Sequence, residues 1–150
     1  MKIIEDYIDF EKSMGPWLGR TVKLVDYHML EAFHKAELDL TKEQMVVLKK
    51  LHDTDGLNQN ELAFLTYRDK SSLARLLSKM EQKNYILRKQ SAEDKRINEV
   101  FLTDKGKLVY QKTRPVIKDI INAMEAGITE DEKQQIIATL KKVQKNFELT

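Results

Sequence analysis

Residues 69–84 read DKSSLARLLSKMEQKN, and the organisation of the whole chain depends on this stretch. On a helix its apolar residues recur at positions i, i+3, i+4 and i+7, which gives one stripe facing a core. The members of the stripe are Leu73, Leu76, Leu77 and Met80. The opposite face carries small hydroxyls, long cations and an amide: Ser71, Ser72, Arg75, Lys79 and Gln82. Such a face suits the major groove of DNA, where arginine pairs with guanine and lysine contacts phosphate. Taken alone, the stretch is more simply a solvated surface helix, so the surrounding segments decide.

Two more helices are predicted directly upstream. Thr41, with Gln three residues later, forms a capping box that starts a helix ending near His52. After a turn over residues 53–56, Asn58 caps a second helix in the same way, and Asp69 is a suitable N-cap for the stretch above. The residues expected to face the core are Met45, Val46, Leu48, Leu51, Leu62, Ala63 and Leu65. Two short helices joined by a tight connection, the second cationic outside, form a helix-turn-helix.

A β-hairpin is predicted directly downstream. Asn84 can end the helix because asparagine tolerates the left-handed backbone conformation. Residues 85–90 and 97–102 then have the composition and partial alternation of strands, around a polar tip at residues 91–96. A hairpin after a helix-turn-helix is a wing. Its tip offers Lys95 and Arg96 to phosphate or to a narrow minor groove.

Apolar helices are predicted on both sides of this centre. We expect a short helix over residues 1–15, broken at Gly15-Pro16, and a longer one from Trp17 to Lys35. Another runs over residues 103–125, with a kink near Gln111 caused by Pro115. A capping box at Thr129 starts the last helix. The apolar residues of the last two helices include Ile117, Ile120, Ile121, Ile136, Ile137, Leu140, Val143 and Phe147. They exceed what a lone winged helix can cover, so we expect a homodimer.

Composition and charge narrow the class of protein. The 150 residues are 41% hydrophobic and 33% charged, which is typical of one soluble globular domain. No apolar run could span a membrane, and the acidic N-terminus disfavours an export signal, so a cytoplasmic location is expected. Without cysteine there is no disulfide or thiol chemistry. Residues 67–96 hold nine Lys or Arg against four Asp or Glu, a net charge of +5, whereas the whole chain carries +2 and the remainder therefore −3. A basic centre of this kind indicates a nucleic-acid reader.

The order and spacing of these motifs resemble the MarR family of winged-helix transcription regulators. The resemblance covers about residues 40–106, and the flanking helices by pattern. It is carried by residues 40–44 (LTKEQ), 59–63 (QNELA), 69–76 (DKSSLARL), 91–96 (SAEDKR) and 102–106 (LTDKG). The wing pattern, an Asp and an Arg one residue apart and then Leu-Thr-x-x-Gly, is the most specific part. Each fragment alone is weak, but their order together is strong.

The resemblance also has departures and implications. Ala74 stands where the family usually has Thr, Asn84 where it usually has Gly, and Ser91-Ala92 where it usually has Asp-Pro. These differences warn against borrowing another member's operator. The resemblance implies one domain, mainly α with a small β-hairpin. A winged helix-turn-helix lobe (about 38–106) would lie between dimerisation helices at 1–37 and 107–150. It also suggests an inducer pocket between the dimer interface and the DNA-binding lobes.

Six residues are predicted to contact DNA. Arg75 is expected to read a base edge, because its guanidinium can pair with guanine. For Arg96 two roles stay open: entry into the minor groove, or pairing with Asp94 to stiffen the wing. The predicted DNA contacts are Ser71, Ser72, Arg75, Lys79, Lys95 and Arg96.

A second group is a candidate for an aromatic, anionic inducer: Trp17, Arg20, Tyr27, Tyr110 and Arg114. Ordinary core and interface packing is the simpler explanation for any one of them. The three histidines, His28, His34 and His52, lack metal-site spacing, so no metal and no cofactor are predicted.

The function predicted from these patterns is a ligand-responsive repressor that binds a palindromic operator in double-stranded DNA as a homodimer. Enzyme motifs such as a glycine-rich phosphate loop or a Gly-x-Ser-x-Gly elbow are missing, so an enzyme is not expected. The alternative is a winged-helix interaction module whose basic face binds a protein or RNA without recognising an operator. Sequence-specific duplex binding with a steep salt dependence would separate the two.

Overall fold

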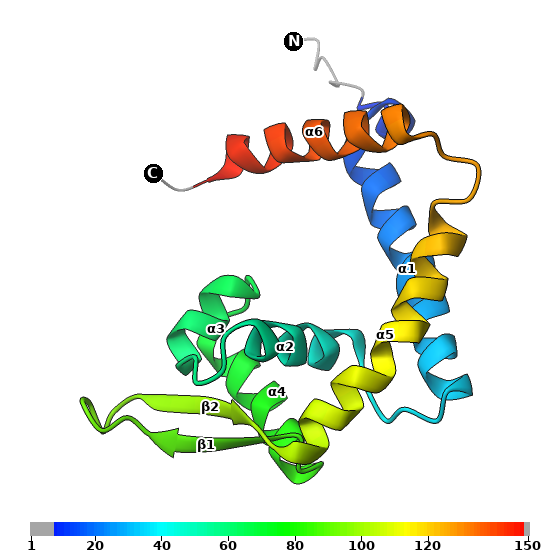
Figure 1. Cartoon of the computed structure of the whole chain (residues 1–150). Helices are drawn as coiled ribbons and strands as arrows, with labels where there is room; N and C mark the ends of the chain where they lie inside the picture. The colour runs from blue at the N-terminus through cyan, green and yellow to red at the C-terminus, as the bar shows by residue number, and fades with distance from the viewer. Residues whose placement is uncertain (1–7, 149–150) are drawn as a thin grey trace, which may run out of the picture.

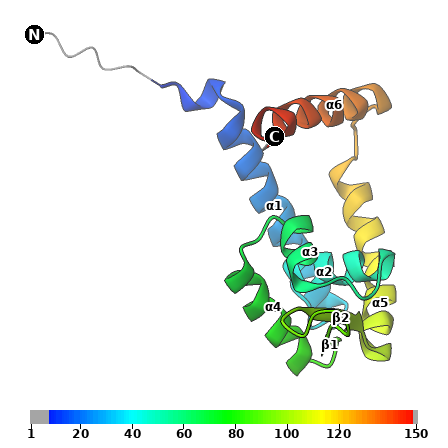
Figure 2. The ribbon, with the colours of Figure 1, turned by 90° about the vertical axis from the view of Figure 1, so that its left-hand side faces the viewer.

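A computed structural model describes residues 8–148 and divides them into a lobe and an arm (Figure 1). The lobe consists of α2 (Lys42–Asp53), α3 (Gln59–Leu65), α4 (Lys70–Gln82) and the antiparallel pair β1 (Ile86–Gln90) and β2 (Asn98–Leu102). The arm consists of the 3₁₀ turn η1 (Phe10–Lys12) with α1 (Met14–Lys35), α5 (Asp104–Met124) and α6 (Glu130–Phe147). In the arm α1 and α5 pack together, and α6 turns away across their far end (Figures 1 and 2). This agrees with the predicted mainly α fold with one small hairpin.

Side-chain caps start the helices where the sequence predicts them. Thr41 and Thr129 form capping boxes. Each hydroxyl accepts from the backbone N–H three residues later, and the side chain of that later residue accepts from the backbone N–H of the threonine. Asn58, Asp69 and Thr103 accept from the N–H three residues on. At the end of α4, Asn84 has φ of 61°, the predicted left-handed residue. Local chemistry therefore fixes the start of five of these helices.

One core holds the lobe together. The apolar stripe of α4 is fully turned into it, with Leu77 and Met80 at 0% exposure. Its buried hydrophobic members are Phe33, Leu38, Leu40, Val47, Leu48, Leu51, Leu62, Ala63, Leu73, Leu76, Leu77, Met80, Tyr85, Ile86, Val100 and Leu102. Helix α1 contributes one fully buried residue to this core, Phe33 near its end, and its Met29 packs against the core while partly buried. The arm is therefore joined to the lobe at one end only.

The hairpin is hydrogen-bonded both within itself and to the segment that follows α2. Ile86 pairs with Leu102 and Gln90 with Asn98. The segment after α2 runs along the other edge of β2, where Gly56 N–H donates to Val100 and Val100 N–H donates to Leu57. The wing is consequently continuous with the helix-turn-helix and not a free flap.

Some predictions about local structure are wrong. The break at Gly15-Pro16 is absent, because Pro16 sits in the first turn of α1, where its missing N–H costs nothing. Residues 1–7 of the predicted first helix lie outside the described residues. Val47, not Val46, is fully buried in α2, whereas Leu48 and Leu51 are buried as predicted. Leu65 is 38% exposed at the end of α3.

Helix α5 is continuous through Pro115, so its predicted kink stays a prediction. Within the described residues, no helix is long and apolar enough to cross a membrane.

Candidate nucleic-acid interface

Helix α4 is fixed by its N-cap and its buried stripe, so that its polar face points to solvent. The Asp69 carboxylate accepts from Ser72 N–H at 2.7 Å and fixes the start of the helix, while the stripe from Leu73 to Met80 is buried. The opposite face is open to solvent: Ser71, Arg75 and Lys79 are exposed, and Ser72 is half-buried. Among residues 8–148, Arg75 and Lys79 have no ion pair or side-chain hydrogen bond, so both cations are available to a ligand.

A shallow groove of about 660 Å³ follows this face of α4. It is lined by Arg68, Ser72, Ala74, Arg75, Leu76, Ser78, Lys79 and Gln82. Arg68 and Ser78 were not among the predicted contacts. Ser78 could have been found, because it lies three residues after Arg75 and so shares its helical face. Arg68 precedes the helix, and only the folded turn brings it beside Ser72.

An ion pair ties α4 to the wing. The Arg88 guanidinium on β1 donates to Glu81 at 2.6 Å and 3.0 Å and to the Ser78 hydroxyl at 3.2 Å. The bonds from Arg88 to Glu81 lower the pKa of the Glu81 carboxyl, and the opposite charge of Arg88 adds to the effect. Because the pair is only partly exposed, it holds the angle between the helix and the hairpin more firmly than a fully solvated pair could.

The wing tip presents its cations to solvent. The Arg96 guanidinium donates two hydrogen bonds of 3.1 Å to the Asp94 carboxylate, and the backbone N–H of Arg96 donates to the same carboxylate. The side-chain hydrogen bonds lower the pKa of Asp94 and raise that of Arg96. The structure thus shows Arg96 paired with Asp94, while 90% of the Arg96 side chain stays exposed to solvent. Entry into the minor groove stays a prediction. Lys95 is exposed beside it.

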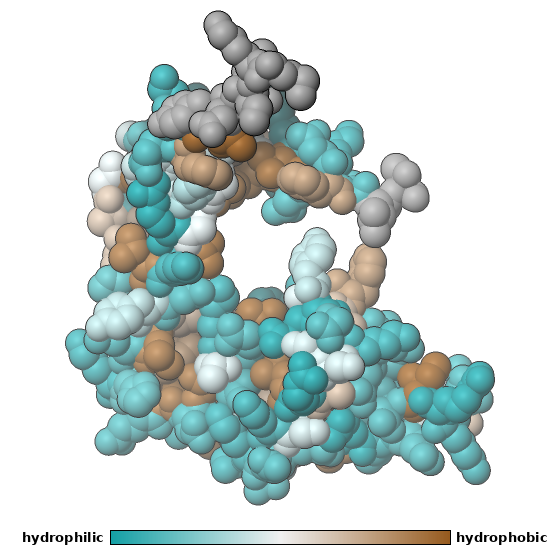
Figure 3. All heavy atoms as spheres, turned by 180° about the vertical axis from the view of Figure 1, so that it is seen from behind, coloured by the Kyte–Doolittle hydropathy of each residue, from teal (hydrophilic) through white to brown (hydrophobic). Residues whose placement is uncertain are grey.

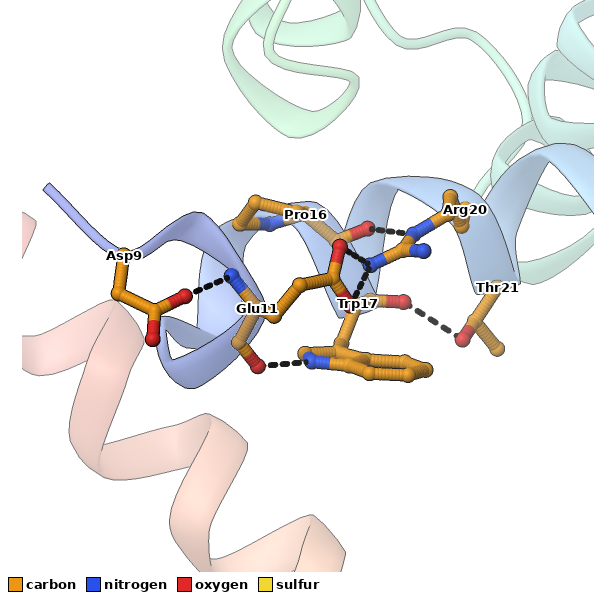
Figure 4. A network of polar contacts seen from close by, with 6 residues as sticks. All are labelled: Asp9, Glu11, Pro16, Trp17, Arg20 and Thr21. Atoms are coloured by element: carbon orange, nitrogen blue, oxygen red, sulfur yellow. Dashed lines mark hydrogen bonds and ion pairs between the residues drawn. The ribbon is translucent and has the colours of Figure 1, made fainter.

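The residues predicted to bind an inducer are only partly brought together. Figure 4 shows Trp17 and Arg20 at the start of α1: the indole N–H donates to the Glu11 carbonyl at 2.7 Å, and Arg20 pairs with the Glu11 carboxylate. The Arg20 guanidinium lies 4.3 Å from the Trp17 ring centre. Tyr110 is elsewhere, with its ring centre 4.6 Å from that of His52 on α2. The remaining two, Tyr27 and Arg114, are exposed on α1 and α5.

A hollow of about 670 Å³ lies between α1 and α5, and none of those five residues lines it. Its lining is mainly apolar, from residues such as Leu24, Val116 and Ile120, with a few charged groups. The charged and imidazole groups that line it are His28, Glu31, Lys35 and Asp119. No group of three His, Asp or Glu in the described part of the chain is arranged to hold a metal ion.

A helix-turn-helix with a cationic second helix, followed directly by a hairpin wing, defines a winged helix-turn-helix DNA-binding protein. The MarR family model matches residues 40–97, the segment from α2 to the wing tip. The HTH-type transcriptional regulator YybA of Bacillus subtilis is 33% identical over 112 residues, which cover 75% of each chain. The chain belongs to the MarR family of DNA-binding transcriptional regulators.

Two solved structures show the same fold over nearly the whole chain. The transcriptional repressor CouR, bound to a 23-mer DNA duplex, superimposes with a TM-score of 0.82 at 20% identity, covering 93% of this chain and 99% of that one. The regulator BpsR of Bordetella bronchiseptica, whose DNA binding is regulated by 6-hydroxynicotinic acid, gives a TM-score of 0.83 at 20% identity, covering 92% and 97%. At this identity the likeness concerns the fold.

Proposed function

We propose that this protein is a ligand-responsive repressor that acts as a homodimer on a palindromic operator in double-stranded DNA. The observation that carries the proposal is the outer face of α4, where Arg75 and Lys79 stand free along an open groove. The proposed DNA contacts are Ser71, Ser72, Arg75, Lys79, Lys95 and Arg96. Arg75 reads a base edge, the serines reach bases or phosphate, and the remaining cations take the backbone and the minor groove.

Substitutions on α4 test this assignment, with binding measured by fluorescence anisotropy on a duplex selected from a random pool. Arg75→Ala is expected to cost about 1–3 kcal/mol per half-site and to flatten the discrimination between the selected and mutated duplexes. Lys79→Ala is expected to weaken both duplexes alike. It also lowers the slope of log affinity against log salt by about 0.9 for each phosphate that the lysine no longer neutralises.

The two results must differ for the assignment to stand. If Arg75→Ala keeps sequence preference and Lys79→Ala abolishes it, α4 docks in another rotation. If the unsubstituted protein shows no preference among duplexes and instead captures a protein or RNA, the interaction-module alternative holds. Both side chains are exposed, so circular dichroism should show an unchanged fold in each variant.

The arm supports the homodimer. Helix α6 buries none of its residues, and Ile136 and Phe147 are 55% and 81% exposed. In Figure 3 hydrophobic side chains gather along the upper helices, next to the opening between α6 and the lobe. Soluble monomers rarely leave so much contiguous apolar surface open. A two-fold dimer would also set two α4 helices about 34 Å apart, one turn of duplex. Sedimentation that shows a stable monomer at micromolar concentration would contradict this.

The ligand response is proposed for an aromatic carboxylic acid bound at the arm. BpsR, which has the same fold, has its DNA binding regulated by a molecule of that class. Trp17 with Arg20 offers a ring and a cation 4.3 Å apart, and Arg114 is the other candidate cation. A panel of aromatic acids should include one that releases the selected duplex. Arg20→Gln and Arg114→Gln, compared in parallel, identify the cation that pairs with it, and release unchanged in both would exclude these residues.

A further inference from the structure

A small polar cleft of about 140 Å³ lies where the helix-turn-helix meets the wing, outside the predicted contact set except for Arg96. The start of α3, the start of α4 and the wing tip each contribute to its wall. It is lined by Gln59, Asn60, Lys70, Arg96, Ile97 and Asn98. We propose that this cleft binds one phosphate of the DNA backbone and so ties α4 and the wing to the same duplex. The inference rests on the proposed docking of α4 and the wing.

The cleft is built by contacts that fix its walls. The Asn98 amide on β2 donates to the Gln59 Oε1 atom on α3 at 3.2 Å, and Asn58 pairs with Glu99 as an isolated bridge. These bonds hold the base of the wing against the first turn of α3. The two sides therefore keep their spacing before any ligand arrives, which reduces the entropy lost on binding.

The donors inside the cleft outnumber the acceptors. The Gln59 Oε1 atom accepts from Asn98, and within residues 8–148 the Gln59 amide N–H₂, the Asn60 side chain and the Lys70 ammonium donate no hydrogen bond. Arg96 donates from its Nε and one terminal nitrogen to Asp94, and its other terminal nitrogen has no partner in the described part of the chain. Such a set matches a phosphodiester, which has only acceptors.

Charge and shape favour the same ligand. No carboxylate lines the cleft, whereas two cations do: Lys70 at the start of α4 and Arg96 at the wing tip. The lining also has no aromatic ring on which a base could stack. A backbone phosphate needs no stacking and gains from both cations. The expected role is therefore positioning and sequence-independent affinity, not base reading.

The position of Lys70 at the start of α4 means that a phosphate bound by Lys70 and Arg96 would contact both the recognition helix and the wing. Lys70 lies two residues before Ser72, which lines the groove of α4, while Arg96 belongs to the wing tip. A phosphate held between these two cations fixes the register of the recognition helix relative to the wing on one duplex. Without it, α4 and the wing would bind through separate contacts.

Lys70→Gln removes the cation and leaves an amide, with Lys112→Gln on α5 as the matched control, because Lys112 is exposed and lines neither the cleft nor the groove. Lys70→Gln should lower the slope of log affinity against log salt by about 0.9 per cleft, which is about eightfold in affinity near 0.1 M salt. The loss should be equal on selected and random duplexes. Lys112→Gln should leave both quantities unchanged.

A second measurement identifies the phosphate. Replacing single phosphates of the duplex by neutral methylphosphonates should reveal one position per half-site where the unsubstituted protein loses about eightfold in affinity and Lys70→Gln loses nothing more. Asn60→Ala should weaken binding to the unmodified duplex but leave the salt slope alone, since the donor it removes is neutral. Circular dichroism controls for folding.

The outcomes separate this inference from the proposed function. Because a backbone contact works on any duplex, the salt titration can be read even if no operator preference exists. Equal salt slopes for Lys70→Gln and Lys112→Gln would overturn the cleft while leaving operator recognition by Arg75 intact. If inorganic phosphate binds the cleft but no methylphosphonate position distinguishes the two proteins, the ligand is a free anion and the inference is wrong.

Discussion

The lobe and the arm differ in how much of their apolar surface is buried within the chain. Among residues 8–148, the buried core hydrophobics lie between Phe33 and Leu102, so the core of the lobe closes within one chain, with Phe33 of α1 completing it. In the arm, α5 buries only Gly106 and Thr113, and α6 buries nothing. Both regions have amphipathic helices of similar quality. The difference shows that the amphipathic pattern of a helix does not decide whether its apolar face is buried within its own chain.

The largest expected effect is at the joint between the two regions. A Cβ atom at Gly106 would lie 2.0 Å from the carbonyl oxygen of Tyr85, with backbone on both sides and no flexible group to yield. Gly106→Ala should therefore cost more than about 4 kcal/mol of unfolding free energy, measured by denaturant titration. Gly19→Ala is the matched control, since nothing lies within 4 Å of its added Cβ, and it should be neutral or slightly stabilising. Equal effects would mean that α5 can move away from Tyr85.

A core truncation tests whether the lobe is self-contained. Leu77 is completely buried beneath α4, so Leu77→Ala should cost about 2–5 kcal/mol through reduced burial and the cavity left behind. The loss should appear as a lower denaturant midpoint. If thermal melting shows no change, the core beneath α4 must repack freely, contrary to a lobe that closes within one chain.

A charge introduced on the arm should weaken association between chains and leave the folding of the lobe unchanged. Ile136 is 55% exposed on α6, so Ile136→Glu costs the single chain little. In the proposed dimer it would bury an unpaired carboxylate and cost roughly 2–4 kcal/mol of association free energy. Sedimentation velocity should show a shift toward monomer, with the circular dichroism of the lobe retained. Unchanged association would place the interface elsewhere.

The smallest expected effect concerns the tether between α4 and the wing. Since Arg88 lowers the folded-state pKa of Glu81, their pairing contributes stability above the ordinary carboxyl pKa of 4.5, and this is lost as pH falls through the folded value. Glu81→Gln should cost about 0.5–1 kcal/mol at neutral pH, after allowance for solvent screening. The difference from the unsubstituted protein should vanish in acid. A difference independent of pH would mean that packing, not charge, holds the tether.

The sequence predicted local features well because their causes are local. A capping residue such as Thr41 acts on N–H groups within its own turn, and the stripe of α4 follows from helical periodicity alone. The same reasoning placed Val46 inward in place of Val47, because α2 meets the core at an angle that periodicity leaves undetermined. It also predicted a break at Gly15-Pro16, although proline is equally suited to a first turn.

By itself, then, the sequence determined the order of the elements, the buried face of α4 and the basic side chains opposite it. These depend on interactions between residues a few positions apart. Only the tertiary structure decided which distant residues share a surface. It brought Gln59, Lys70 and Arg96 from three elements into one cleft, and it separated Tyr110 from Trp17, which the sequence had grouped by chemistry. Such neighbours are set by the packing angles of helices against the core, and one chain's periodicity does not contain those angles.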